Sequence, residues 1–509
     1  MPRRAVLVLL AALLVAAAGA GSAHPVVAAP GGPCPAWPTS FSVPPEIRVL
    51  RVASGTVDTV PFRAYVENVL AWEWPSTYPA EALKAGAIAV KQYAWYYLMR
   101  PRTAYVTPTG ACYHVRDDTN DQKYDPARTP HANHLAAVTA TWPLTLRKSG
   151  TFFLSGYGPG TADTCGADLS SIRTRLAQRG VRACALAGMP MADILRIYLD
   201  PGLVIASGER LAGPDRFATG AAVSAATFGT GVPVVFVATG LDFPDALAAG
   251  PAAARLGGPV LLVGATGLSE SVAAELVRLQ PASIVVLGGP SVVGDDVLTA
   301  LAAYAPTVTR IAGATRYETA AAASAATFAP GVPIAFVATG MNFPDALVGA
   351  AAGARLGGPV LLVPGDGVPE AVATELTRLQ PARIRVLGGP SVVSDATLEA
   401  LRAYSADVDR LAGATRYATA AAVSAALYEA GAPFVDLATG LNFPDALSAG
   451  PRGGPLLLVP PTGPLPPEAA MEAARLAPAR LVALGSVGAL SDAAVAGVAA
   501  ALAGGASAQ

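Results

Sequence analysis

The sequence predicts an α/β protein in which a mixed α+β domain precedes three tandem Rossmann-like modules with parallel sheets. The first observation is a repeat: RLAGPDRFATGAAVSAATF at Arg210 returns as RIAGATRYETAAAASAATF at Arg310 and as RLAGATRYATAAAVSAALY at Arg410. The period of 100 residues exceeds the roughly 20–50 residues of a solenoid repeat and has the size of a small domain. The second observation is that short apolar runs alternate with Ala-rich helical segments inside each copy.

The division of the chain follows from this repeat. We expect a signal peptide at 1–29, a leader domain at 44–204, and repeats at 210–309, 310–409 and 410–505. All five Trp, all four Cys, all four His and all four Lys precede Leu203. Redox, metal or imidazole chemistry is therefore confined to the leader domain. A net charge of −1 and the absence of a basic tract exclude a nucleic-acid-binding protein.

The N-terminus has the pattern of an export signal. Arg3 and Arg4 precede an apolar core from Ala5 to Ala18, and Ala18-Gly19-Ala20 is one of several small-residue cleavage options. The core is shorter than the about 20 residues of a spanning helix, although an uncleaved anchor is the alternative. Later Ala-rich runs contain Arg, Asp and Pro. We expect a secreted protein of the cell wall or cell surface with no stable membrane span after cleavage.

Export makes the four cysteines disulfide candidates. Cys34, Cys112, Cys165 and Cys184 allow three connectivities. We favour Cys165 with Cys184, which would join a loop to the helix before GMPMADILRIYL, and Cys34 with Cys112 by elimination.

The most informative carboxylate of the leader domain is Glu73. Pro79 and Glu81 mark the start of a helix from about Ala80 to Leu98. Just before it, Glu73 lies between Trp72 and Trp74 and ahead of Pro75, in a turn that we expect to be non-helical. Partial desolvation among indoles raises a carboxyl pKa toward that of a general acid, and indole faces stack on sugar rings. The alternative is that both tryptophans are core residues and that Glu73 caps a backbone amide.

The segment around Glu73 also carries a family resemblance. YVENVLAWEWPSTYPAEALKAGAIAVKQYA, starting at Tyr65, resembles the pattern YVxxVxPxExPxxWPxEALKAQAxAxRTYA of the SpoIID/LytB family of sporulation and wall-remodelling proteins. VRDDTNDQKY, HLAAVTATWPLTLRKSGTFF and MADILRIYLDPGL resemble later segments, so the likeness runs from about Pro44 to Val204. It implies that Glu73 is the catalytic glutamate of a lytic transglycosylase acting on peptidoglycan glycan strands, with Trp72 and Trp74 contacting the substrate.

One carboxylate suffices for that reaction. It protonates the glycosidic oxygen and then accepts the proton of the sugar's own 6-hydroxyl. We interpret Glu67 as a solvated side chain and Glu81 as a first-turn helix charge. The family's Ser-Gly-Gly-rich and Ser-Gln-x-Gly-Ala segments are altered in SGYGPGTADTCGADLSSIRTRLAQRG. A non-catalytic glycan-binding or scaffold protein that supports another wall hydrolase is therefore the alternative.

A metal or cofactor is not expected. Some relatives bind zinc near the segment that reads ACYHVRDDTNDQKY here, but this segment offers only Cys112 and His114. His131 and His134 could complete four ligands, yet a disulfide at Cys112 would forbid the site. The dinucleotide fingerprint G-x-G-x-x-G is missing, which argues against NAD or FAD.

Within each repeat, strands and helices alternate. In the first copy, runs bounded by Gly and Pro predict strands at Val234–Val237, Val260–Val263 and Ile284–Leu287, with helices at about Asp245–Leu256, Glu270–Leu279 and Asp295–Tyr304. This order predicts a parallel sheet with right-handed crossovers. Ligands of such sheets bind at the carboxyl ends of the strands. There the repeats place two glycine pairs that resemble an anion cradle, and three aspartates that fit helix N-caps: Gly288-Gly289, Gly388-Gly389, Asp245, Asp345 and Asp445.

The repeats resemble the cell wall binding repeat 2 family. RxAGxxRYxTA, ATGxNFPDAL, GGPVLLV and VLGGPS follow in that order from Arg210 to about Ala503. The likeness implies three modules packed around a pseudo-threefold axis that hold the protein to anionic wall polymers. Arg216, Arg316 and Arg416 recur in register and are the expected guanidinium donors, the alternative being a structural role at the module interface.

The third copy departs from the first two. It reads PRGGPLLLV, four residues shorter than PAAARLGGPVLLV, and LGSVGALSD instead of LGGPSVVSD. We therefore expect unequal binding, with the third copy degenerate or acting as a cap. An enzyme acting on nucleotides or sugars is disfavoured for the repeats because they lack His, Cys and Lys.

Overall fold

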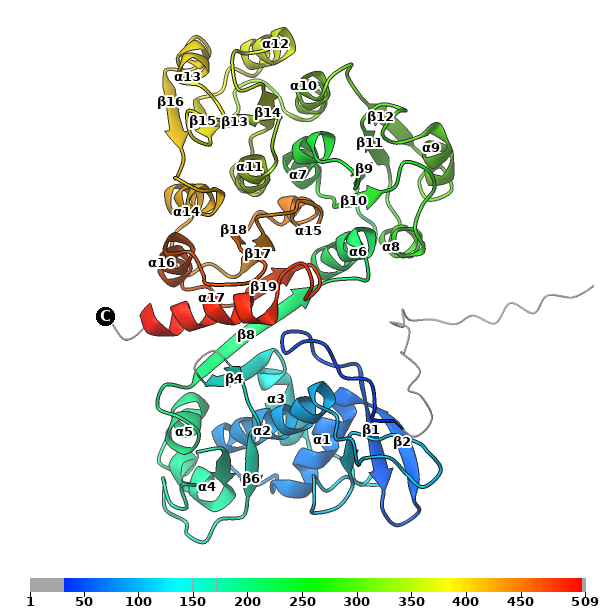
Figure 1. The fold of residues 1–509 in the computed structure, drawn as a ribbon, viewed down its shortest axis with the longest axis vertical. Coiled ribbons are helices and arrows are strands. Elements are labelled where there is room, and N and C mark those ends of the chain that lie inside the picture. The colour runs from blue at the N-terminus through cyan, green and yellow to red at the C-terminus, as the bar shows by residue number, and fades with distance from the viewer. Residues whose placement is uncertain (1–31, 149–150, 171–172, 506–509) are drawn as a thin grey trace, which may run out of the picture.

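The computed structural model describes residues 32–148, 151–170 and 173–505, so the predicted signal at 1–29 lies outside the described residues. Figure 1 shows two bodies, the leader domain below and the three repeats above, joined along the strand β8 (Val204–Leu211). The repeats together are called the array from here on. Within the described ranges, no helix combines the length and the apolar character needed to cross a bilayer.

The leader domain surrounds one long buried helix, α2 (Ala80–Met99). Its start after Pro79 confirms the predicted helix, and thirteen of its residues are buried, including Lys91, whose ammonium group donates to three backbone carbonyls. The other elements are β1 (Glu46–Arg51), β2 (Thr56–Pro61), α1 (Phe62–Glu73), β3 (Val115–Arg116), α3 (Ala132–Thr141), β4 (Leu144–Lys148), β5 (Thr151–Phe152), β6 (Gly156–Gly158), β7 (Arg175–Ala177), α4 (Gln178–Leu186) and α5 (Met191–Tyr198).

Both favoured disulfides are present. Cys34 is bonded to Cys112, and Cys165 is bonded to Cys184. The second bond ties the loop between β6 and β7 to α4, as predicted. The first ties the chain entering the domain to the segment before β3, which pairs with β1 in a three-stranded sheet of order β2-β1-β3.

The array repeats one pattern of elements. The first copy contains α6 (Arg216–Thr227), β9 (Val235–Thr239), α7 (Pro244–Leu256), β10 (Val260–Val263), α8 (Glu270–Leu279), β11 (Ile284–Leu287) and α9 (Asp295–Leu301). The second contains β12 (Val308–Ile311), α10 (Arg316–Thr327), β13 (Ala335–Thr339), α11 (Pro344–Leu356), β14 (Val360–Val363), α12 (Glu370–Leu379), β15 (Arg383–Leu387) and α13 (Asp395–Leu401). The third contains β16 (Asp407–Leu411), α14 (Arg416–Leu427), β17 (Val435–Thr439), α15 (Pro444–Leu447), the 3-10 turn η1 (Gly450–Arg452), β18 (Leu456–Val459), α16 (Pro467–Leu476), β19 (Leu481–Leu484) and α17 (Asp492–Gly505).

The strands of the array form parallel sheets, as predicted, but the fourth strand of each comes from outside its own copy. The third sheet continues from β8 into β4 and β5 of the leader domain, which are antiparallel. The first sheet has the order β10-β9-β11-β12 and the second β14-β13-β15-β16, so the fourth strand comes from the start of the next copy. In the third sheet that place is taken by β8, which precedes the first copy. The array is therefore closed into a ring.

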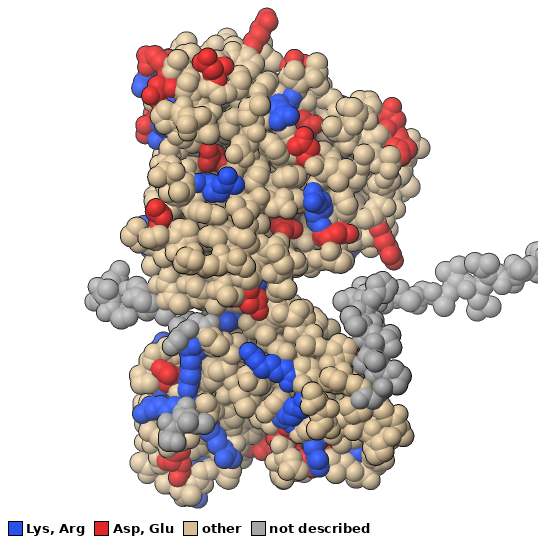
Figure 2. Space-filling model, in the orientation of Figure 1, with Lys and Arg blue, Asp and Glu red and all other residues tan. Residues whose placement is uncertain are grey.

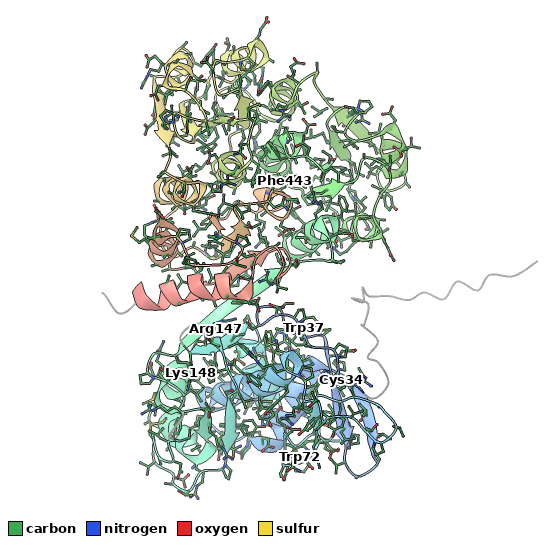
Figure 3. All side chains as sticks on the ribbon, viewed as in Figure 1. Cys34, Trp37, Trp72, Arg147, Lys148 and Phe443 are labelled. Atoms are coloured by element: carbon green, nitrogen blue, oxygen red, sulfur yellow. A yellow bond between two sulfur atoms is a disulfide. The ribbon has the colours of Figure 1, made fainter. Side chains whose placement is uncertain are left out.

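The centre of the ring is a shared core. One cluster of buried side chains contains residues of all three copies. Phe243, Phe343 and Phe443 form a triangle with ring centroids 5.7–5.9 Å apart, and Figure 3 shows Phe443 near the middle of the array. This arrangement confirms the pseudo-threefold packing of the modules.

Candidate functional site

Glu73 is the last residue of α1 rather than part of a non-helical turn. The amide of Trp74 still donates to the Leu70 carbonyl at 2.9 Å, so the helix continues until Pro75 stops it. One carboxylate oxygen of Glu73 accepts from the backbone N–H of Lys123 at 3.2 Å. Its carbonyl accepts from Nε2 of Gln178 at 2.8 Å, which anchors the backbone of Glu73 to α4.

The carboxyl group of Glu73 is half-buried. Burial raises its pKa above the ordinary value, while the Lys123 amide and the Lys123 charge oppose this effect. Desolvation favours the neutral form of a carboxyl group. Glu73 is thereby biased toward the protonated state that a general acid needs.

The two tryptophans beside Glu73 lie in different environments. Trp72 is 40 % exposed, with the Arg128 guanidinium 4.6 Å and the Lys123 ammonium 5.7 Å from its ring. Trp74 has no exposed surface and packs against Tyr78 and Tyr157. The predicted contact of Trp74 with a sugar is therefore corrected to a packing role in this structure.

Burial of Trp74 depends on Gly86 of α2. A Cβ atom at Gly86 would lie 2.6 Å from two atoms of the Trp74 indole. Gly86 stands where the family pattern EALKAQA has Gln. The indole thus occupies the space that this departure from the pattern opens.

Sequence reasoning missed Gln178 and Gly180. Gln178 begins α4 and holds the Glu73 carbonyl. A Cβ atom at Gly180 would lie 2.0 Å from the Tyr198 hydroxyl, which accepts from the amide of Gly166. The signal is the Gln-x-Gly spacing in Ala177-Gln178-Arg179-Gly180, which keeps part of the otherwise altered Ser-Gln-x-Gly-Ala segment.

A cavity of about 310 Å³ adjoins this region along β6 and β7. Its lining includes Gly160, Asp168 and Arg175, and ends at Ala177, the neighbour of Gln178. The Asp168 carboxylate accepts from the Thr161 amide and hydroxyl, so it shapes the loop over the cavity.

The remaining carboxylates named from sequence are engaged elsewhere. Glu67 pairs with Arg63 one helical turn earlier at 2.8 Å. Glu81 lies in the first turn of α2, as predicted, where its bond to Lys84 lowers its pKa and its other oxygen accepts from the Met191 amide.

The four residues weighed as zinc ligands are not brought together. Cys112 is in a disulfide, and His114 is buried, with its pKa lowered to about 4 by burial. His131 and His134 form a capping box at the start of α3. In the part of the chain that the structure describes, no three His, Cys, Asp or Glu side chains are grouped as metal ligands would be.

The three arginines of the array lie at equivalent joints between modules. Arg216, Arg316 and Arg416 begin α6, α10 and α14, and each donates through Nη1 to a strand-end carbonyl, that of Gly240, Gly340 and Gly440 respectively. Each guanidinium also lies 5.8–5.9 Å from the central Phe ring of the preceding module in the ring. The structural role considered for these arginines is therefore present at all three joints.

The aspartates of the FPDAL motifs belong to the same joints and are not N-caps. The N-cap of α7 is Phe243, and Asp245 lies inside the first turn, with Thr319 and Arg316 of the next module acting on its carboxyl group. Burial raises the pKa of Asp245, that of Asp445, and that of Asp345 to about 6. The N-cap prediction was wrong because a proline starts each of these helices, so that each N-cap lies two residues before the aspartate.

One joint encloses a cavity of about 170 Å³ between the first two modules. Its lining includes Asp245, Gly289, Ser291 and Arg316, so it lies at the carboxyl ends of the strands, where the motifs predicted a site. Gly288 has a φ of +102° and donates its amide to the Ile311 carbonyl. Only the second glycine of the predicted cradle therefore faces the cavity.

The array as a whole is acidic. Residues 204–509 contain 16 Lys and Arg but 23 Asp and Glu, whereas residues 32–203 contain 17 and 13. On the face shown in Figure 2, Lys and Arg predominate on the leader domain and Asp and Glu on the repeats. Attraction of an anionic polymer to the array therefore has to come from individual arginines rather than from its net charge.

Comparison with known families matches both parts of the chain. The model of cell wall binding domain 2 matches residues 210–298, 310–398 and 410–495, which together are more than half of the chain. The model of the stage II sporulation protein matches residues 52–146. The chain is thus a SpoIID domain followed by three cell wall binding repeats.

Individual relatives cover parts of it. The N-acetylmuramoyl-L-alanine amidase LytC of Bacillus subtilis is 24 % identical over half of this chain and half of its own length. The amidase enhancer of the same organism is 30 % identical over 43 % of this chain and 30 % of its own length. Among solved structures, Cwp6 and Cwp8 from Clostridium difficile align with TM-scores of 0.53 at 22 % and 24 % identity, over 58 % and 61 % of this chain and 47 % and 54 % of theirs. The chain spans half or less of the curated relatives that it matches.

Proposed function

The chain belongs to the cell wall binding domain 2 family, and from that premise we propose a wall-attached lytic transglycosylase, whose leader domain cuts peptidoglycan glycan strands while its repeats hold anionic wall polymers. The single observation that carries the enzymatic part is Glu73, a half-buried carboxyl group with a raised pKa beside an exposed tryptophan. The matched families directly support association with the cell wall.

Glu73 takes both proton-transfer roles in this proposal. Its protonated carboxyl gives the proton to the glycosidic oxygen as the bond from that oxygen to the anomeric carbon breaks. The resulting carboxylate accepts the proton of the same sugar's 6-hydroxyl, whose oxygen bonds to the anomeric carbon and closes an anhydro ring. No water is consumed, and Glu73 ends protonated again.

The surroundings of Glu73 support this chemistry. Lys123 donates its amide to the carboxylate, and Gln178 fixes the backbone, so two elements hold the group in place. The Trp72 ring offers an exposed apolar face for a sugar, with Lys123 and Arg128 beside it as cations. Preorganised groups of this kind lower the cost of reaching the reactive geometry.

The test uses the full-length protein and purified glycan strands. We expect Glu73→Gln to lower the release of anhydro-ended fragments by about a hundredfold or more, because amide cannot transfer the proton. Glu67→Gln is the matched control, since it changes a glutamate of the same helix that pairs with Arg63. Mass spectrometry of the products checks the outcome, and full activity of the Glu73 variant would contradict the assignment.

A second function is favoured by the likeness to the amidase enhancer. In that case the leader domain binds glycan without cutting it and increases the action of an amidase on the wall. An amidase assay on isolated walls separates the two. Under the first proposal Glu73→Gln removes strand cleavage, whereas under the second the wild type releases no anhydro ends and both proteins stimulate the amidase equally.

A further inference from the structure

The segment Thr39–Phe41, which precedes the first strand of the leader domain, is buried in the third repeat. Phe41 is 1 % exposed and belongs to the hydrophobic cluster of β17, β18, β19 and α17. Its ring lies on Gly208 of β8, where a Cβ atom would be 2.5 Å from Cδ1 of Phe41. The missing side chain of Gly208 is therefore what makes room for Phe41.

In the other two sheets, a valine occupies the position equivalent to Gly208. Gly208 pairs with Leu481 in the third sheet, and the equivalent strands place Val308 opposite Ile284 and Val408 opposite Ile384. Val408 is 6 % exposed, and Val308 packs against the core of the first module, whose sheet β12 completes. A valine at these positions fills the slot that the ring of Phe41 occupies in the third repeat.

The polar contacts of Asp492 also distinguish the third repeat from the other two. The Asp492 carboxylate accepts from the Thr39 hydroxyl at 2.7 Å, from the Ser40 amide at 2.7 Å and from Arg210 at 2.9 Å. Its counterparts Asp295 and Asp395 pair with the equivalent arginines, and their side chains are 74 % and 78 % exposed against 24 % for Asp492.

The leader domain contributes a buried cation to the same contact. The Arg147 side chain, on β4, is 2 % exposed, donates to the Ser40 hydroxyl at 2.9 Å, and lies 3.8 Å above the Phe41 ring. The backbone of β4 pairs with residues 204–207 of β8, and the next four residues of β8 pair with β19. One strand thus passes from the leader domain into the third sheet without a linker.

We infer that Thr39–Phe41 is a docking peptide that fixes the leader domain on the third repeat alone, with Gly208 and Asp492 as its receptor. The glycine at 208 of β8, where β12 and β16 have valine, then marks an interface inside the chain. Figure 3 shows Arg147 and Trp37 at the side of the leader domain that faces the array and Trp72 at its far end. In the docked state Trp72 therefore points away from the repeats in one fixed orientation.

The distribution of tryptophan makes docking measurable without any wall component. All five Trp precede Leu203, so Trp fluorescence follows the leader domain, whereas far-UV circular dichroism is dominated by the helices of the array. Domains that are docked unfold together, and coincident transitions from two probes report such coupling. We expect the wild-type transitions to coincide.

Gly208→Val introduces into β8 the valine that β12 and β16 have at the equivalent position. We expect this variant to separate the two transitions, with the fluorescence midpoint lowered, and to speed proteolysis of residues 32–43 by about tenfold or more, because the segment is no longer held. Phe41→Ala, which adds no atoms, and Asp492→Asn should act in the same direction. Asp395→Asn is the matched control and should change neither readout.

Two outcomes would overturn the inference. One is separate transitions in the wild type, which would show that the domains are not coupled. The other is unchanged transitions and unchanged proteolysis in both Gly208→Val and Phe41→Ala. Neither readout requires glycan or wall polymer, so the result is independent of whether the proposed function holds.

Discussion

The pair Trp74 and Gly86 shows how one residue is understood only from its neighbour. Next to Glu73, a tryptophan suggests a sugar platform, because indole faces stack on sugar rings. The indole nevertheless has no exposed surface, because α2 offers a glycine at the point of contact. Trp72, with 40 % of its surface exposed, is accessible to a ligand, and its contact with a sugar stays a prediction. Spacing in the sequence cannot separate the two tryptophans, since exposure depends on which helix packs against each.

We expect Gly86→Ala to destabilise the leader domain. The added methyl group would sit 2.6 Å from the Trp74 indole, and overpacking of this kind costs about 1–3 kcal/mol. Thermal unfolding followed by Trp fluorescence measures the change. Gly156→Ala is the control, because its nearest atoms are 3.9 and 4.0 Å away. Equal melting temperatures for the two variants would contradict the packing role of Gly86.

At the scale of elements, the sequence prediction missed one strand in each sheet of the array. The runs at β8, β12 and β16 mix charged and apolar residues and stand at the start of each copy, so they do not have the continuous apolar pattern of β9 or β10. Each completes the sheet of another copy. Strands inside one copy could be predicted from burial on both faces, whereas a strand exchanged between copies depends on where the modules sit.

A buried ion pair occupies the region where the third copy is shortened. The helix α15 stops after four residues, and Arg452 of η1 fills the space beside β17, where Asp436 replaces Phe236 and Phe336 of the other copies. The pair is buried, with an Nε–Oδ2 distance of 3.0 Å, and Arg452 also donates to Thr227 of the first copy. The shortened segment is therefore held by an ion pair within the third copy, and the hydrogen bond from Arg452 to Thr227 connects it to the first copy.

This ion pair predicts a pH dependence of stability. Burial raises the pKa of Asp436 to about 6, above its unfolded value of about 3.8. Its folded-state preference for a proton stabilises the fold fully below pH 3.8, and this contribution is lost as the pH rises through 6, a change of about 2–3 kcal/mol. We expect the unfolding free energy of the wild type to fall relative to that of Asp436→Asn between pH 4 and pH 7.

Denaturant unfolding at several pH values checks this expectation. Asp407→Asn is a control of opposite sign, because the hydrogen bond from Arg385 lowers the pKa of Asp407 and its contribution is lost as the pH falls. A pH-independent difference between the wild type and Asp436→Asn would contradict the raised pKa of Asp436.

At the scale of the whole molecule, the three modules form one closed body. The ring closes through β8, the three central Phe rings touch, and each joint contributes one arginine. Three linked weak sites bind a polymer far more tightly than one, because the second and third contacts form within a single complex. Because the net charge of the array is acidic, we propose these arginines as the donors for an anion.

We expect retention on isolated walls to fall with each joint arginine removed. Arg316→Ala should weaken it several-fold, and combined substitution of Arg216, Arg316 and Arg416 by about a hundredfold or more. Co-sedimentation with walls at several salt concentrations measures the effect, and thermal unfolding checks that the ring stays closed. Arg383→Ala is the control, because Arg383 is the first residue of β15, whereas the joint arginines bond to carbonyls at the carboxyl ends of strands. Undiminished retention by a folded triple variant would contradict the binding role.

The sequence by itself determined the number of modules, their parallel sheets, the helix after Glu73 and the family of each part. These properties follow from local periodicity and from motifs that repeat within a short stretch of chain. Tertiary structure alone decided which tryptophan is buried, which copy supplies each fourth strand, and that the third repeat receives Phe41 in the slot at Gly208. Those outcomes depend on contacts between residues up to about 450 positions apart, such as Ser40 and Asp492, and no local pattern encodes them.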